Sequence, residues 1–175
     1  MPGKSNKLLI IVDADAIIAL NNRVDTNHEK AKNVLTQLTA FEAHTLFPAT
    51  AICEAVTILR GRLNKPEGAE QVMKQFHAGN FPLQEVGYKE LLKAADLFHP
   101  QGSKKNTLFD AVVAAVAKHL HADAIFSFDG SYRKIGLSLT DDLIAQRPLL
   151  KTTARASGQA RGETVASTLL LLSGQ

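Results

Sequence analysis

Short continuous apolar runs alternate along the chain with stretches of helical spacing. Residues 8–12 and 124–128 are apolar and partly β-branched runs of strand length. Such runs are typical of strands that are covered on both faces, as in a parallel sheet. Residues 44–47, stopped by Pro48, and residues 83–86 are weaker strand candidates. The pattern therefore predicts two central strands with further strands beside them.

Helices are predicted between these strands. Residues 28–41 carry apolar side chains at helical spacing, and Thr50 is expected to cap a helix that contains Glu54. Three further helices are expected at residues 66–76, 88–98 and 107–117. The last is apolar nearly all round and hence central, with Asn106 or Thr107 as its cap. This alternation predicts an α/β fold, a three-layer α/β/α arrangement around a mainly parallel central sheet.

Four acidic residues, Asp13, Glu54, Asp110 and Asp129, interrupt or end apolar runs. Buried carboxylates are costly unless they are paired or bound to a cation, and no Lys or Arg stands beside them in these runs. Asp13 and Asp129 end predicted strands, while Glu54 and Asp110 lie near helix starts. Because ligands bind at the carboxyl ends of parallel strands, where helices also begin, all four can reach one crevice.

Carboxylates gathered in this way suit a hard divalent cation, Mg²⁺ or Mn²⁺. Such an ion can activate a water molecule and stabilise charge on a phosphate, which is nuclease chemistry. The net charge of +3 is weak support for a polyanionic partner. Basic residues do follow or precede three of the acids in sequence, namely Arg60, Arg62, Lys65, Lys104, Lys105, Arg133 and Lys134.

The length of 175 residues fits one domain, which we place at residues 1–150. Cys53 is the only cysteine, so no internal disulfide can form. We expect Cys53 to be a small core residue and the protein to be cytoplasmic. The first apolar run is too short for a signal peptide or a membrane span. Residues 151–175 form a tail that is either flexible or docks on the domain, on a second copy or on a partner.

The segments around the four acids, read in order, resemble the PIN domain, and most closely the single-domain ribonuclease toxins of the VapC type. The resemblance covers roughly residues 8–140. The matching segments are residues 12–20, 48–55, 108–117 and 126–129, followed by 132–137.

This resemblance implies an endoribonuclease that depends on Mg²⁺ or Mn²⁺ and uses Asp13, Glu54, Asp110 and Asp129. Ser127 matches a family position where a small hydroxyl residue helps to arrange the last acid. Asp15 departs from the family, which more often has Ser, Thr or Asn there, and it either adds a metal ligand or caps the next helix. The resemblance also implies RNA as substrate, a cognate antitoxin protein and a homodimer.

Two other functions compete with this interpretation. Asp13 and Asp15 after a buried strand also resemble the nucleophile motif of haloacid-dehalogenase-like phosphatases, with Asp141 and Asp142 as a later acidic pair. That family's usual continuation after the motif is missing, and Glu54 and Asp110 would have no role. The second alternative is a non-catalytic PIN-like interaction module, against which the complete set of four acids argues.

Overall fold

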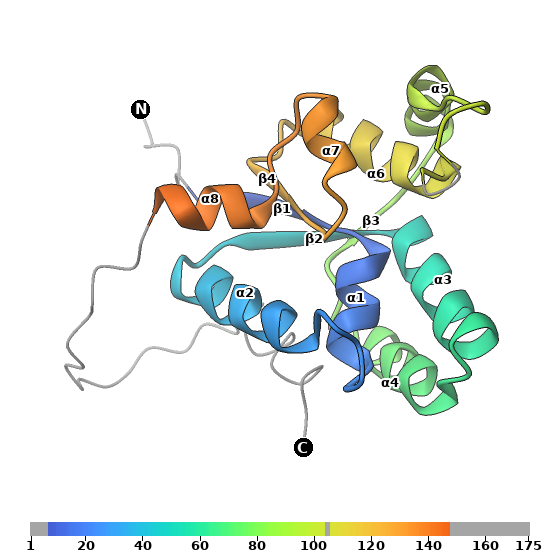
Figure 1. The fold of residues 1–175 in the computed structure, drawn as a ribbon, viewed down its shortest axis with the longest axis vertical. Coiled ribbons are helices and arrows are strands. Elements are labelled where there is room, and N and C mark those ends of the chain that lie inside the picture. The colour runs from blue at the N-terminus through green and yellow to red at the C-terminus, as the bar shows by residue number, and fades with distance from the viewer. Residues whose placement is uncertain (1–6, 104–105, 148–175) are drawn as a thin grey trace.

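The computed structural model describes residues 7–103 and 106–147, and the tail predicted at 151–175 lies outside them. Its centre is a parallel sheet with the strand order β3-β2-β1-β4 (Figure 1). The strands are β1 Leu9–Val12, β2 His44–Pro48, β3 Leu83–Gln84 and β4 Ala124–Phe126. The predicted mainly parallel sheet is confirmed.

β1 is central because both of its edges are paired. Ile10 lies opposite Thr45 of β2 on one side and opposite Ala124 of β4 on the other. Ile10, Ile11 and Val12 are each 0% exposed, as expected of a strand covered on both faces. The carboxyl end of β1 therefore lies between two other strand ends.

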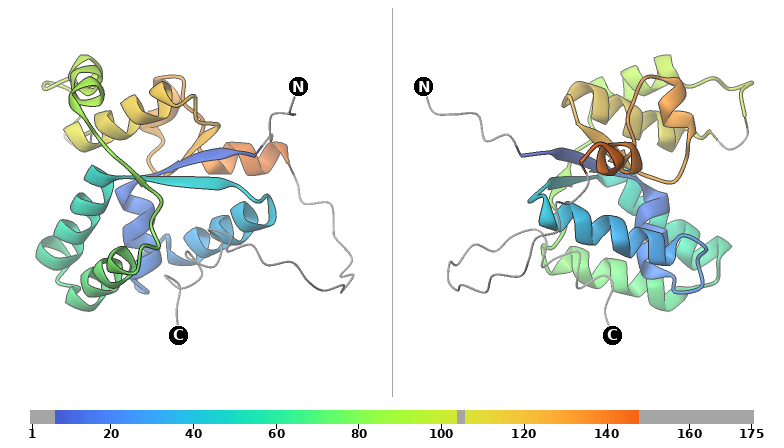
Figure 2. Two further views of the ribbon diagram at one scale, coloured as in Figure 1. Left: turned by 180° about the vertical axis from the view of Figure 1, so that it is seen from behind. Right: turned by 60° about the vertical axis from the view of Figure 1, so that its left-hand side comes forward.

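Helices lie on both faces of the sheet (Figures 1 and 2). One layer contains α1 Ala14–Asn21, α2 His28–Ala40, α3 Ala49–Thr57 and α4 Pro66–His77, with a π-helical turn, η1 Ile58–Arg62, continuing α3. The other contains α5 Tyr88–Leu97, α6 Leu108–His119 and the short α7 Ser131–Lys134. Helix α8, Thr140–Gln146, contacts β4 and α2 at one edge. The predicted three-layer arrangement is confirmed.

The central helix predicted from the sequence is α6. All residues from Ala111 to Ala117 are buried, because α6 packs against both α5 and β1. Thr107 is its N-cap, as predicted, and its side chain accepts a hydrogen bond from the Asp110 N–H. The first turn of α6 thus carries Asp110 in a fixed orientation.

Two local predictions are wrong. Thr50 does not cap α3, because β2 runs as far as Pro48 and the chain enters the helix directly at Ala49. The hydroxyl of Thr50 is instead buried in the first turn without a hydrogen-bond partner. Strand β4 ends at Phe126 rather than Phe128, so the chain leaves the sheet at Ser127.

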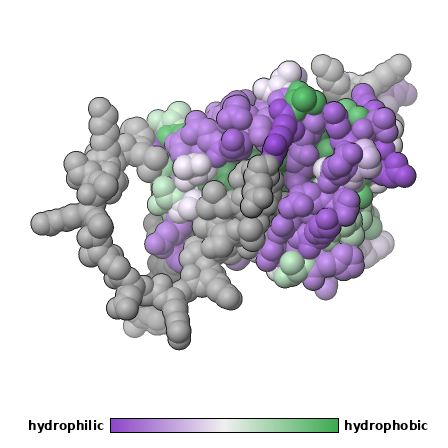
Figure 3. Space-filling model, turned by 90° about the horizontal axis from the view of Figure 1, so that it is seen from below, coloured by the Kyte–Doolittle hydropathy of each residue, from purple (hydrophilic) through white to green (hydrophobic). Residues whose placement is uncertain are grey.

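The surface seen in Figure 3 is largely hydrophilic, with small scattered apolar patches between the polar groups. In the part of the chain that the structure describes, no helix is both long enough and apolar enough to cross a membrane.

Candidate active site

Asp13 follows β1 directly and is the N-cap residue of α1. Its Oδ1 accepts a hydrogen bond from the Ala14 N–H at 2.7 Å, and its Oδ2 accepts one from the Tyr132 hydroxyl at 2.9 Å. The backbone N–H of Asp13 donates to the Phe126 carbonyl at 3.1 Å, which ties the ends of β1 and β4 together. The side chain is almost fully buried, with 3% of the residue exposed.

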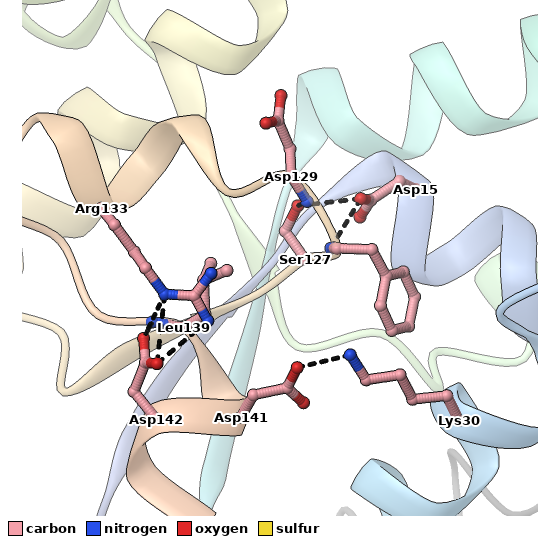
Figure 4. Close-up of polar contacts among 9 residues, drawn as sticks. Asp15, Lys30, Ser127, Asp129, Arg133, Leu139, Asp141 and Asp142 are labelled. Carbon is pink, nitrogen blue, oxygen red and sulfur yellow. Dashed lines mark hydrogen bonds and ion pairs between the residues drawn. The ribbon is translucent and has the colours of Figure 1, made fainter.

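Asp15 and Ser127 connect α1 to the turn that carries Asp129 (Figure 4). Asp15 Oδ2 accepts hydrogen bonds from the Ser127 hydroxyl at 2.9 Å and from the Phe128 N–H at 2.8 Å. Ser127 Oγ in turn accepts one from the Asp129 N–H at 3.1 Å. Because Asp13 occupies the N-cap position, the alternative in which Asp15 caps α1 is wrong, and its role as a metal ligand stays a prediction. Asp15 instead joins two segments that are far apart in sequence.

Asp110 and Glu54 come from two different helices. Asp110 Oδ2 accepts hydrogen bonds from the backbone N–H of Thr107 and from its hydroxyl, which completes a capping box at the start of α6. Glu54 lies half-buried in the second turn of α3. Helix α3 follows β2 at its carboxyl end, and α3 contacts α6. The two helices thus bring these acids to the edge of the sheet where Asp13 lies.

The pKa values of these acids show that their charges act on one another. Burial, then the charges of Asp15 and Asp110, raise the pKa of Asp13 well above its ordinary value. Burial and the charges of Asp110 and Asp15 raise the pKa of Glu54 to about 7. Burial raises the pKa of Asp15 to about 6, and the charge of Asp129 adds to this. The pKa of Asp110 is also raised, by burial first and by the charge of Asp129.

The acids therefore form a coupled group that resists full ionisation in the absence of a cation. Carboxylate oxygens are the ligands that Mg²⁺ and Mn²⁺ prefer, and Asp15 Oδ1 is buried without a hydrogen-bond partner. Within residues 7–103 and 106–147, however, no three His, Cys, Asp or Glu side chains are grouped so that they could hold a metal ion. The donors fit a hard cation in their chemistry, but their side chains do not yet converge on one point.

Two basic residues near the turn of Ser127 to Asp129, Arg133 and Lys30, are engaged in ion pairs. Arg133 forms hydrogen bonds of 2.9 to 3.1 Å with both carboxylate oxygens of Asp142 (Figure 4). Lys30 pairs with Asp141 and lies 5.4 Å from the centre of the Phe128 ring. Asp142 also accepts the Leu139 N–H at 2.9 Å at the start of α8. Asp141 and Asp142 therefore serve ion pairs and a helix start, which does not favour the phosphatase interpretation.

Tyr132 is a residue of the site that the sequence did not reveal. It belongs to the segment 132–137 that matches the family, but its hydroxyl reaches Asp13 from the core, where Tyr132 is 1% exposed. The signal available in the sequence was a tyrosine, with its polar hydroxyl, three residues after Asp129. Tyr132 and Asp110 also line a cavity of about 130 Å³ between α6, α7 and the end of α5.

Two larger hollows are lined by none of the four acids. One, of about 320 Å³, is lined by residues around the end of α1 and the start of α4, including Asn21, His28 and Lys65. The other is an apolar groove of about 360 Å³ between α3, α4 and Leu83. Cys53 lines this groove and is exposed, so the prediction that it is a core residue is wrong. It lies on the outward face of α3, beside Glu54.

Comparisons with known proteins agree with this fold. The PIN domain family profile matches residues 10–137. The crystal structure of Mycobacterium tuberculosis VapC20, described as a toxin that cleaves the sarcin-ricin loop, is similar in fold with a TM-score of 0.62. Its sequence identity is 20%, and the match covers 73% of this chain and 95% of that chain. No curated relative matches in sequence. The match extends over most of the chain and includes all four predicted acids, so the chain belongs to the PIN domain family.

Proposed function

We propose that this protein is a metal-dependent endoribonuclease of the VapC toxin type, which hydrolyses RNA phosphodiester bonds. One observation carries the proposal. Asp13 is buried at the carboxyl end of the central strand, and burial together with neighbouring carboxylates raises its pKa. Acids with strongly shifted pKa values cluster at functional sites, so a buried Asp13 beside other carboxylates indicates such a site.

Asp13, Glu54, Asp110 and Asp129 are the residues that would hold Mg²⁺ or Mn²⁺. The bound ion would supply an activated water molecule and stabilise negative charge on the phosphate. Three further residues, Thr107, Ser127 and Asp15, would position these acids. Thr107 holds Asp110 through the capping box, and Ser127 holds the backbone of Asp129 at 3.1 Å. Asp15 fixes Ser127 in turn, with an oxygen-to-oxygen distance of 2.9 Å.

RNA as substrate is supported by the fold and by the surface near Glu54. VapC20, which shares the fold, is described as cleaving the sarcin-ricin loop. Arg60 and Arg62 are exposed on η1, which continues the helix that carries Glu54. Exposed cations of this kind attract the phosphates of a nucleic acid. The proposal also includes a cognate antitoxin and a homodimer, which the resemblance of the sequence to VapC-type toxins implies.

The experiment is a cleavage assay on a stem-loop RNA with a single-stranded region. We expect cleavage with Mg²⁺ or Mn²⁺ and none in excess EDTA. Asp13→Asn and Asp129→Asn should each lower the rate by on the order of 10²-fold or more. Asp142→Asn is the matched control, because this acid pairs with Arg133 outside the coupled group. Undiminished cleavage in excess EDTA would exclude the metal mechanism.

A further inference from the structure

Tyr132 has a position that packing alone does not explain. Its ring is among the largest fully buried side chains of the described residues, and it lies on α7, just after the turn that carries Asp129. A buried tyrosine hydroxyl needs a hydrogen-bond partner. The partner here is Asp13, 119 residues earlier in the chain and itself almost fully buried. A phenylalanine would fill the same space without requiring an acid.

The hydrogen bond restricts the orientation of the Asp13 carboxylate. The last side-chain torsion of an aspartate is broad, so a carboxylate without partners samples many orientations. Two donors from different elements act on this one: the Ala14 N–H at Oδ1, 2.7 Å away, and the Tyr132 hydroxyl at Oδ2, 2.9 Å away. A carboxylate has about four acceptor positions, so each oxygen keeps one for another partner. The two donors thus determine where the remaining acceptor positions point.

The two donors reach Asp13 from different elements, Ala14 from α1 and Tyr132 from α7. Ala14 can offer its N–H only along the axis of α1, so the hydroxyl of Tyr132 is the donor that sets the orientation from the side of α7.

We propose that Tyr132 is a positioning residue for Asp13, whose carboxylate it orients so that the free acceptor positions face the divalent ion. This inference rests on the proposed function, because it assigns that ion to the same acids. Tyr132 would then contribute to metal binding without being one of the four acids that hold the ion. Residues that orient metal ligands in this way typically contribute 10- to 100-fold to affinity or activity.

The test is Mn²⁺ binding by titration calorimetry, with the full chain and without RNA. Tyr132→Phe removes one oxygen and keeps the ring, and we expect it to weaken Mn²⁺ binding about tenfold or more. The matched control is Tyr88→Phe. Tyr88 is the other of the two tyrosines and is 78% exposed. The Tyr88→Phe variant should therefore bind Mn²⁺ with the affinity of the parent. Equal affinity of Tyr132→Phe and the parent would overturn the inference and leave the proposed function standing.

A double-mutant cycle separates positioning from a general loss of structure. If Tyr132 acts through Asp13, then adding Tyr132→Phe to Asp13→Asn should lower Mn²⁺ affinity no further. Losses that multiply would mean that Tyr132 acts by another route. A Tyr132→Phe variant that fails to fold, as judged by circular dichroism, assigns the hydroxyl to the fold and also overturns the inference. A parent protein that binds no Mn²⁺ would overturn the metal site itself.

Discussion

Raising the pH should destabilise the metal-free protein, because the coupled acids are protonated in the folded state at pH values where the unfolded chain has released these protons. The pKa of Asp15 is about 6 in the folded protein against an ordinary value of 3.8. The pKa of Glu54 is about 7 against 4.5. For a raised pKa, the stabilising contribution is present at low pH and is lost as the pH rises through the folded value. The loss therefore runs from about pH 4 to about pH 7, and its upper part can be followed between pH 5 and pH 8.

The magnitude follows from Asp15, whose Oδ1 is fully buried. The difference between 3.8 and about 6 corresponds to about 3 kcal/mol of unfolding free energy, at about 1.4 kcal/mol per pH unit. Glu54 is only half-buried, so solvent screening reduces its share and we assign it no figure. For a domain of this size, 1 kcal/mol shifts the melting temperature by about 2 to 4 °C. Only the last pH unit of this difference, from pH 5 to about pH 6, is lost above pH 5, which is about 1.4 kcal/mol. We therefore expect the metal-free protein to melt about 3 to 6 °C lower at pH 8 than at pH 5.

The assay is thermal unfolding in EDTA across this pH range, followed by circular dichroism. Asp15→Asn should make the decline smaller, because it removes one of the titrating acids. Asp142→Asn should keep it, because the hydrogen bond from Arg133 lowers the pKa of that carboxyl and places its titration below the range. Saturating Mg²⁺ should reduce the decline, since an ion that binds only the folded state stabilises it. A melting temperature in EDTA that stays constant or rises from pH 5 to pH 8 would refute this reasoning.

Three further predictions concern single residues. Asp15→Ala should slow RNA cleavage about tenfold, while Asp15→Asn, which still has an acceptor oxygen for Ser127, should stay closer to the parent; equal rates for the two variants would contradict this role. Thr107→Ala should cost about 1 kcal/mol in denaturant unfolding through loss of the α6 cap, and an unchanged midpoint would speak against it. Asp110→Ala should lose on the order of 10²-fold in RNA cleavage. Turnover of a phosphomonoester that survives Asp110→Ala but is abolished in Asp15→Ala would favour the phosphatase instead.

The sheet and the central helix could be predicted because burial on all sides leaves continuous apolar runs. β1 and α6 are of this kind, with Ile10 to Val12 and Ala111 to Ala117 all buried. Element ends were less predictable. Ser127 to Phe128 continues the apolar run of β4 in composition, yet the chain turns there to meet Asp15. Thr50 is of a residue type that often caps helices, but the chain continues from β2 into α3 without a residue free to cap it.

The four acids could be predicted as a group because each stands at the end of an apolar run, and such ends gather at one edge of a parallel sheet. Thr107 was predicted as a cap and Ser127 was expected from the resemblance, but the long-range contacts of the supporting residues could not be predicted. The contact of Ser127 with Asp15 joins residues 112 positions apart, and that of Tyr132 with Asp13 joins residues 119 apart. Each depends on the direction of one side chain in the folded core, which no spacing in the sequence encodes. These pairings are thus visible only in the structure.

The acidic site is a compromise between forces that act in opposite directions on the same carboxylates. Asp13 and Asp110 lie at the starts of α1 and α6, where helix dipoles favour negative charge. Hydrogen bonds from Ala14 and Tyr132 also favour the ionised form of Asp13, yet burial and the neighbouring acids prevail and its pKa is raised. A bound cation would remove the repulsion without disturbing the helix starts or the hydrogen bonds. Conditions that strengthen metal binding should therefore also stabilise the fold. A variant that lacks one of the acids should be more stable than the parent without metal, and added metal should stabilise it less.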